Sequence, residues 1–355
     1  MSEKSAYAAA GVDIEAGDRA VDLMKEWVTK TQRPEVLGGI GGFAGLFDAS
    51  AVKRMDHPVL ATSTDGVGTK VAIAQAMGTH ETIGFDLVGM VVDDLVVCGA
   101  EPLFMTDYIA CGRVVPERIA AIVKGIAEAC VQAGCALLGG ETAEHPGLLE
   151  PDEYDVAGAA TGVVDRDKIL GAERVRPGDV MLALGSSGLH SNGYSLVRHV
   201  LLSQAGWSLD RDVPELGKTL GAELLTPTKV YARDCLELMK AVEVHAISHI
   251  TGGGLANNLA RVIPDSVEVR IDRTTWQPAA IFGLVQRVGA VSQADLEATV
   301  NMGVGMVVVM PPTSVDQAIR LLNRRGVSSW VCGTAAPSGS GTRSRVSLFG
   351  QHAHE

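Results

Sequence analysis

The chain has 355 residues, of which 46% are hydrophobic and 20% charged, and its net charge is −12. This length favours two globular domains, and this composition excludes extensive disorder. The acidic balance argues against nucleic acid as the main partner, although a local cationic site can still bind a small anionic substrate.

The N-terminal residues contain no apolar segment of the signal-peptide kind, and apolar runs such as 306–310 are too short to span a bilayer. Six cysteines form no Cys-x-x-Cys pair, and several lie within apolar runs. This usage predicts reduced, packed thiols in a cytoplasmic protein and leaves zinc binding or a catalytic thiol as minor alternatives.

Strands alternate with helices in the first half of the chain. Between Pro116 and Gly134 apolar residues recur with the helical period, and proline and glycine suit the start and the end of the helix. The elements predicted in this half are helices at 19–30, 84–99 and from 116, and strands at 58–63, 103–109, 136–138 and 155–164.

A charged, turn-rich segment at 171–179 predicts a domain boundary near residue 170, with domains at 1–170 and 171–355. The second domain repeats the order of strand, glycine-rich loop and helix, so the predicted fold class is mixed α/β. We expect the strand at 329–332 to end the fold and 338–344 to be a loose connection or tail. The other elements predicted here are strands at 180–184, 244–249 and 303–310, and helices from 194, from 255 and at 314–325.

Residues 64–70 read Thr-Asp-Gly-Val-Gly-Thr-Lys and directly follow an apolar strand. Glycines let the backbone approach phosphate groups, a lysine neutralises them, and a carboxylate binds Mg²⁺. The stretch is not a P-loop, because Thr69 separates Gly68 from Lys70. It therefore predicts ATP binding in a different fold, and the candidate residues are Asp65, Gly66, Gly68, Thr69 and Lys70.

Three carboxylates lie on the helix predicted at 84–99. Asp86 and Asp93 are two helical turns apart and share a face, and a buried carboxylate is costly unless it is paired or bound to metal. Two interpretations remain open. At least one of Asp86, Asp93 and Asp94 binds a metal ion, or these acids are solvated or cap a local turn.

Glu141 lies in a Gly-Gly-Glu-Thr stretch after a buried strand, where α/β sheets place their ligands. The alternative interpretation of this stretch is a glycine turn in which Glu141 is simply exposed to solvent. Together with Asp65 and the helix acids, Glu141 completes a candidate Mg²⁺ site for nucleotide phosphates.

Three glycine-rich loops are candidates for phosphate contacts. The loop at 38–43 is equally consistent with a structural turn. The loops at 185–193 and 251–254 each lie between a predicted strand and a helix, where backbone N–H groups favour the binding of an anion. The alternative is that they are ordinary flexible loops. The candidate residues are Gly41, Gly42, Ser191, Asn192, Gly252 and Gly253.

His190 lies in the second of these loops, among serine, asparagine and glycine. That setting favours a role as an acid, a base or an anion donor over that of a surface histidine. Lys25, on the early helix, has the pattern of an ordinary solvated lysine.

Read together, these stretches resemble the phosphoribosylformylglycinamidine cyclo-ligases, also called AIR synthetases. The resemblance runs through nearly the whole chain in the expected order. The matching stretches lie at 7–17, 33–43, 64–70, 139–144, 154–158, 185–197 and 249–254.

The resemblance implies an N-terminal ATP-binding and dimerisation domain whose sheet forms a β-barrel across a homodimer, followed by a second α/β domain. It implies ATP-dependent cyclisation of formylglycinamidine ribonucleotide to 5-aminoimidazole ribonucleotide in purine biosynthesis, with Mg²⁺, ADP and phosphate. By resemblance, the metal residues are Asp65, Asp94 and Glu141, and the catalytic residues are His190, Lys25 and Lys70.

One departure concerns Asp93, because the family often has asparagine there and the role of the extra carboxylate is open. Two alternatives to a cyclo-ligase remain. A small-molecule kinase of the same superfamily is expected to keep the acids but not the stretch at 185–197. A regulatory ATP-binding module is expected to keep the glycine loops without needing the metal acids.

Overall fold

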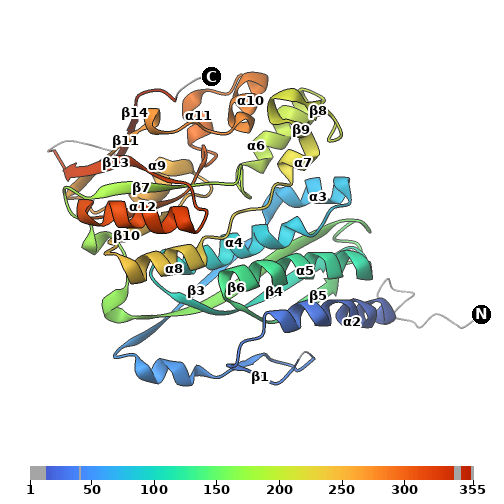
Figure 1. Ribbon diagram of the computed structural model, residues 1–355. Coiled ribbons are helices and arrows are strands. Elements are labelled where there is room, and N and C mark those ends of the chain that lie inside the picture. Colours follow the sequence, from blue (N-terminus) through green and yellow to red (C-terminus); the bar gives the residue numbers. More distant parts are fainter. Residues whose placement is uncertain (1–12, 40, 340–344, 353–355) are drawn as a thin grey trace, which may run out of the picture. The chain divides into compact units, whose positions relative to one another are not determined.

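The computed structural model describes residues 13–39, 41–339 and 345–352 (Figure 1). The chain divides into two compact units. Unit 1 comprises Met1–Leu95 and Glu101–Arg166, and unit 2 comprises Val96–Ala100 and Asp167–Glu355.

Unit 1 is built around a four-stranded sheet of order β3-β6-β4-β5, in which only the β4–β5 pair is parallel. Its main elements are α2 (Ile14–Lys30), β1 (Val36–Leu37), β2 (Leu46–Phe47), β3 (Pro58–Gly66), α3 (Val71–Met77), α4 (Thr82–Val96), β4 (Glu101–Cys111), α5 (Pro116–Ala133), β5 (Ala136–Glu144) and β6 (Tyr154–Asp165).

Helices α4 and α5 lie in close contact, because both carry a glycine at their crossing. A Cβ on Gly84 would lie 1.9 Å from the backbone nitrogen of Ile126, and one on Gly125 would lie 1.8 Å from the Glu81 carbonyl oxygen. Leu87 of α4 in turn contacts β6, so this helix covers one face of the sheet. The other face exposes Leu60, which is 68% accessible.

Unit 2 contains a six-stranded sheet of order β10-β12-β7-β13-β11-β14, antiparallel except for the β11–β14 pair. Its main elements are β7 (Val180–Gly185), α6 (Tyr194–Arg198), β8 (Asp212–Val213), β9 (Lys218–Thr219), α7 (Leu220–Leu224), α8 (Ala232–Ala241), β10 (Ala246–His249), α9 (Gly254–Ala260), β11 (Val267–Asp272), α10 (Ala280–Gly289), α11 (Gln293–Glu297), β12 (Val304–Met310), α12 (Val315–Arg324), β13 (Ser329–Pro337) and β14 (Val346–Phe349).

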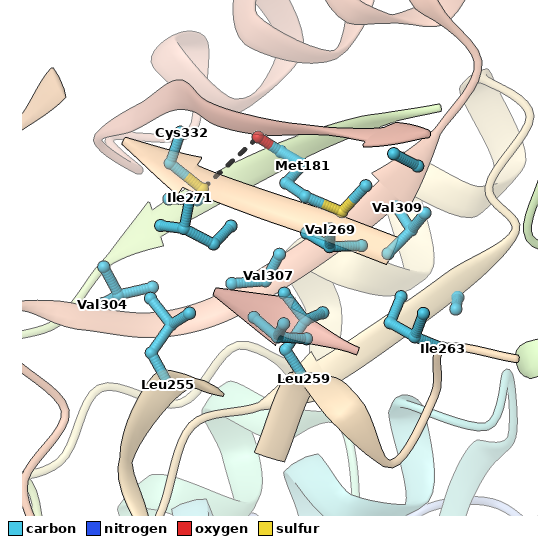
Figure 2. Packing of buried hydrophobic residues seen from close by; sticks show 14 of the residues in the cluster. Met181, Leu255, Leu259, Ile263, Val269, Ile271, Val304, Val307, Val309 and Cys332 are labelled. Atoms are coloured by element: carbon cyan, nitrogen blue, oxygen red, sulfur yellow. Dashed lines mark hydrogen bonds between the residues drawn. The ribbon is translucent and has the colours of Figure 1, made fainter. Parts of the chain in front are cut away.

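The core of unit 2 lies between this sheet and helix α9. Figure 2 shows Leu255 and Leu259 of α9 close to Val304 and Val307 of β12, and all four are buried. Every residue of β12 is buried, as expected for a central strand covered on both faces. This central strand sets the position of the turn that precedes it, at residues 301–303.

The predicted mixed α/β class is confirmed, but several boundaries were wrong, and three of them concern the candidate site or the end of the fold. Strand β3 continues through Gly66 and β5 through Glu144, so Asp65 and Glu141 lie within strands rather than in loops. The fold does not end at 329–332, because β13 runs to Pro337 and β14 follows. Ladder hydrogen bonds to neighbouring strands explain how these glycine-containing segments remain extended.

Within the described residues, no helix is long and apolar enough to cross a membrane. All six cysteines are free, and burial raises the pKa of Cys135 and Cys332 to about 12. Such thiols stay protonated at neutral pH and are poor nucleophiles. Most of the connection predicted at 338–344 lies outside the described residues, since only 338–339 are described.

Candidate active site

Unit 1 contains a cavity of about 750 Å³ between helix α2, the glycine-rich loop and strands β4 and β5. It brings together three of the predicted residues, Gly41, Gly42 and Glu141. Apolar side chains of α2, such as Val21 and Met24, form one wall. An apolar wall that faces a few polar groups is typical of a small-molecule site.

Asp107 lies in this cavity, and the sequence analysis missed it. Burial raises the pKa of its carboxyl to about 7. The carboxylate occupies the space over Gly140, because a Cβ there would lie 1.6 Å from Asp107 Oδ1. The available signal was a single acidic residue in the mainly apolar strand predicted at 103–109.

Asp107→Asn is expected to stabilise the protein at pH 8 but not at pH 4. The folded pKa is raised, so the folded state holds its proton longer and the wild type loses stability as pH rises from about 4 to about 7. A pKa raised from 3.8 to about 7 corresponds to at most about 4 kcal/mol, and the partial exposure of the residue reduces this. Urea unfolding at both pH values measures the difference.

The matched control for this experiment is Asp155→Asn, which changes an exposed aspartate on β6. It should alter the free energy of unfolding equally little at both pH values. Equal effects of Asp107→Asn at pH 4 and pH 8 would show that the Asp107 carboxyl titrates normally.

Lys70 and Asp86 form a buried ion pair in unit 1. The distance from Lys70 Nζ to Asp86 Oδ1 is 2.7 Å, and both side chains are fully buried. Lys70 precedes α3, and Asp86 lies on α4, so the pair links these two helices. The arrangement explains how the apolar helix α4 accommodates a carboxylate, and it gives Lys70 a structural role beside the predicted phosphate contact.

The helix acids divide between the interior and the surface. Asp93 is fully buried on the same side of α4 as Asp86, as their seven-residue spacing predicts, whereas Asp94 is exposed. The additional carboxylate at position 93 therefore belongs to the interior, and Asp94 is the one accessible to a ligand.

Asp65 and Glu141 lie at opposite edges of the four-stranded sheet, on the outer strands β3 and β5. Three strand spacings amount to about 14 Å, too far for two carboxylates of one chain to hold one metal ion. Within residues 13–39, 41–339 and 345–352, no three His, Cys, Asp or Glu side chains gather as a metal site. A metal held by protein ligands alone therefore does not fit, whereas Mg²⁺ bound by one or two carboxylates and nucleotide phosphates does.

The remaining candidates of unit 1 lie at its surface. Gly68 and Thr69 are exposed at a single 3₁₀ turn that follows Gly66. Lys25 is also exposed, and its Nζ lies 2.6 Å from Asp22 Oδ1 on the same helix. Exposed pairs of this kind contribute little to stability, so Lys25 is free to exchange partners.

His190 is buried in unit 2, with 1% of its surface exposed, so it is not an ordinary surface histidine. Its φ of 61° is left-handed, a conformation that is costly for a side chain of this size. The backbone N–H of Ser187 donates to His190 Nε2 at 3.1 Å. This contact requires a lone pair on Nε2, as in a neutral imidazole that carries its proton on Nδ1.

The two glycine-rich loops of unit 2 meet at Asn192 and Gly252. A Cβ on Gly252 would lie 3.4 Å from Asn192 Oδ1. The second loop is held by buried Asn258, whose Nδ2 donates to the carbonyls of Thr251, Gly252 and Gly254. The structure thus joins two stretches that the sequence analysis treated as separate candidates.

Ser191 and Gly253 complete the predicted set in these loops. Ser191 is 9% exposed, directly after His190. Gly253 and Gly254 both have positive φ, and a Cβ on Gly254 would lie 1.7 Å from the Glu297 carbonyl oxygen. The close approach explains why this loop needs glycine.

Two family models cover most of the chain. Residues 47–164 match the N-terminal domain of AIR synthase related proteins, and residues 176–344 match their C-terminal domain. The chain is 51% identical to a phosphoribosylformylglycinamidine cyclo-ligase of Shouchella clausii over 334 residues, 94% of this chain and 96% of that protein. A cyclo-ligase of Geobacillus kaustophilus is 49% identical over 331 residues, 93% and 95% of the two chains.

Solved structures of the same fold are more distant. A thiamine-monophosphate kinase from Stenotrophomonas maltophilia aligns with a TM-score of 0.68 at 19% identity and covers 94% of this chain and 97% of its own. A hydrogenase maturation protein in complex with ATP aligns with a TM-score of 0.63 at 17% identity, covering 95% and 92%. At these identities the likeness concerns the fold alone.

Proposed function

This chain belongs to the phosphoribosylformylglycinamidine cyclo-ligase family, and we propose that it closes the imidazole ring of 5-aminoimidazole ribonucleotide in purine biosynthesis. The substrates are formylglycinamidine ribonucleotide and ATP. The observation that carries the proposal is identity near one half over almost the whole length of curated cyclo-ligases. The enzyme is thus an ATP-dependent ligase that forms a carbon–nitrogen bond.

The reaction needs no nucleophile from the enzyme. The γ-phosphoryl group of ATP passes to the formyl amide oxygen and leaves ADP. The neighbouring amidine nitrogen attacks the same carbon and loses a proton, and the carbon–oxygen bond breaks to release phosphate. An amide oxygen is a poor leaving group and phosphate a good one, so positioning and charge stabilisation supply most of the catalysis.

We propose that ATP binds unit 1, with Gly41 and Gly42 beside the nucleotide at the cavity and the 64–70 stretch beside its phosphates. Asp65 and Asp94 would hold Mg²⁺ together with phosphate oxygens, because both carboxylates are exposed. When bound, Mg²⁺ neutralises charge on the phosphates. Glu141 remains a predicted metal ligand, but it lies too far from Asp65 across the sheet to bind the same ion within one chain.

Within the 64–70 stretch, the backbones of Gly66, Gly68 and Thr69 would contact phosphate. Lys70 would act through its ion pair with Asp86, which fixes the end of that stretch. Lys25 is retained as a predicted catalytic residue, supported by its exposure and by the resemblance alone.

Unit 2 is proposed to bind the substrate with the two loops that meet at Asn192 and Gly252. Backbone N–H groups around Gly252 and Gly253, with Ser191, suit a phosphate or a developing oxyanion. His190 would donate a hydrogen bond through Nδ1, because its Nε2 already accepts one from Ser187. This makes His190 a donor rather than a base at Nε2.

The same family implies a homodimer with a β-barrel formed by two sheets. The face of the unit 1 sheet opposite α4 supports this proposal, because the apolar side chains of Leu60 and Tyr108 are 68% and 42% exposed there. A boundary between domains near residue 170 and a cytoplasmic location remain part of the proposal.

The first experiment is a product assay with the purified chain, Mg²⁺, ATP and formylglycinamidine ribonucleotide. We expect ADP, phosphate and aminoimidazole ribonucleotide in equal amounts, and no ADP when the ribonucleotide is omitted. Thiamine monophosphate should not be phosphorylated in the same assay. A folded protein that forms no aminoimidazole product would refute the proposal.

A further inference from the structure

Asn301 is a buried polar residue that the proposed function leaves without a role. It lies in the turn before β12 and is 1% exposed. Its Nδ2 donates to the Gly188 carbonyl at 2.9 Å, and its Oδ1 accepts from the Gly303 backbone N–H at 2.9 Å. The side chain therefore connects the turn before β12 to the loop that carries His190.

These two contacts require an amide. One end must donate to a carbonyl oxygen and the other must accept from an N–H, and an asparagine side chain supplies both. An aspartate has the same shape but places a second acceptor against the Gly188 carbonyl, which leaves two acceptors facing each other. A buried polar group without its partner is costly, so the site discriminates between asparagine and aspartate.

The turn that holds Asn301 is itself anchored on both sides. Met302 has a left-handed φ of 50°, and its carbonyl accepts a hydrogen bond from Trp276 Nε1 at 2.9 Å. The Gly303 carbonyl accepts from the Ser186 N–H, also at 2.9 Å. These bonds fix Asn301 relative to the core of unit 2.

The residues held by Asn301 lead directly to the His190 ring. Gly188, whose carbonyl it binds, has a φ of 146° and lies between Ser187 and His190. Ser186 Oγ donates to the same carbonyl at 2.9 Å, which further fixes the loop. With Gly188 held, the Ser187 N–H points at His190 Nε2 and sets the position of the ring proton.

We propose that Asn301 is a positioning residue for His190, which it keeps as a neutral imidazole with the proton on Nδ1. It acts through the Gly188 carbonyl and the Ser187 N–H. The effect of Asn301 on turnover rests on the proposed function, in which His190 donates through Nδ1. The effect of Asn301 on the protonation of the His190 ring does not depend on the proposed function.

The test observes the ring itself. In the full-length protein labelled with ¹⁵N-histidine, the signals of His190 are identified by their loss in His190→Asn. We expect the wild type to show a protonated Nδ1 and an unprotonated Nε2, and Asn301→Asp to show a mixture of tautomers or a protonated ring. Val269→Ala, a core change on β11, controls for loss of stability and should leave the His190 signals unchanged.

Ser186→Ala provides a second variant in case Asn301→Asp does not fold. It removes the hydroxyl that donates to the Gly188 carbonyl at 2.9 Å and also lies 3.3 Å from Asn301 Oδ1, while the Asn301 side chain itself is kept. A smaller change in the same direction is expected. Unchanged His190 signals in a folded Asn301→Asp protein, or equal changes in Val269→Ala, would overturn the proposal.

Kinetics then separate this inference from the proposed function. Asn301→Asp is expected to lower kcat about 10- to 100-fold with little change in KM for ATP. In a His190→Asn background the same change should alter kcat less than about twofold, because both act through one group. An equal loss of kcat from Asn301→Asp in the wild-type and His190→Asn backgrounds would overturn the positioning role of Asn301. Altered His190 ring signals in Asn301→Asp, together with full activity of His190→Asn, would refute only the catalytic role of His190.

Discussion

Lys70→Met is expected to lower the free energy of unfolding by about 3–5 kcal/mol, one of the largest effects of any single change in unit 1. Methionine has a similar length but no charge, so the substitution removes the cation that lies 2.7 Å from the buried Asp86 carboxylate. A carboxylate in the interior is destabilising without that charge. Urea unfolding of both proteins at pH 7 measures the difference.

The control is the double variant Lys70→Met/Asp86→Leu, in which both charges are gone. Replacement of a whole buried pair by apolar residues is often neutral, so most of the lost stability should return. If Lys70 were chiefly a phosphate contact, Lys70→Met would keep wild-type stability and raise KM for ATP instead. Lys30→Met, at an exposed pair with Glu26, should change the free energy of unfolding by less than about 1 kcal/mol.

His190→Asn is expected to lower kcat by about 100- to 1,000-fold, the loss typical of one donor to a developing charge. Asparagine tolerates left-handed backbone better than most residues, so the φ of 61° can be kept while the imidazole is removed. The assay is steady-state formation of aminoimidazole ribonucleotide, with the fold checked by circular dichroism.

His190→Ala separates the backbone from the ring. Alanine lacks the imidazole, so the His190→Ala variant should lose kcat to the same extent as His190→Asn. Alanine is also less stable than asparagine at positive φ, so the free energy of unfolding should be about 1 kcal/mol lower than in His190→Asn. Wild-type turnover in His190→Asn would return His190 to a purely structural role, in which its ring packs against Gly305.

The sequence predicted the elements whose patterns are local. Helix α5 follows from a proline start, a 3.6-residue apolar period and Gly134 at the end, and the structure places the helix at Pro116–Ala133. The identity of the family likewise followed from short stretches in a fixed order. These features depend on neighbouring residues and can be read without knowledge of tertiary contacts.

Features that depend on distant partners were missed. The stretch at 139–142 reads as a glycine turn, but pairing with β4 keeps it extended. Nothing near Lys70 indicates that its partner is Asp86, because the contact arises where α3 and α4 meet. The setting of Asp107 likewise depends on tertiary structure, because residues of α2 line the cavity in which it lies.

The order of strands in unit 2 has a consequence for how the chain is made. Strand β7 is the first strand of this sheet to be synthesised, yet its only sheet neighbours in the described chain are β12 and β13. About 120 residues separate Gly185 from Val304, which at typical rates of translation takes on the order of 10 s. During that interval the apolar strand β7 has no sheet partner, so nascent unit 2 exposes a surface that a chaperone can cover until β12 emerges.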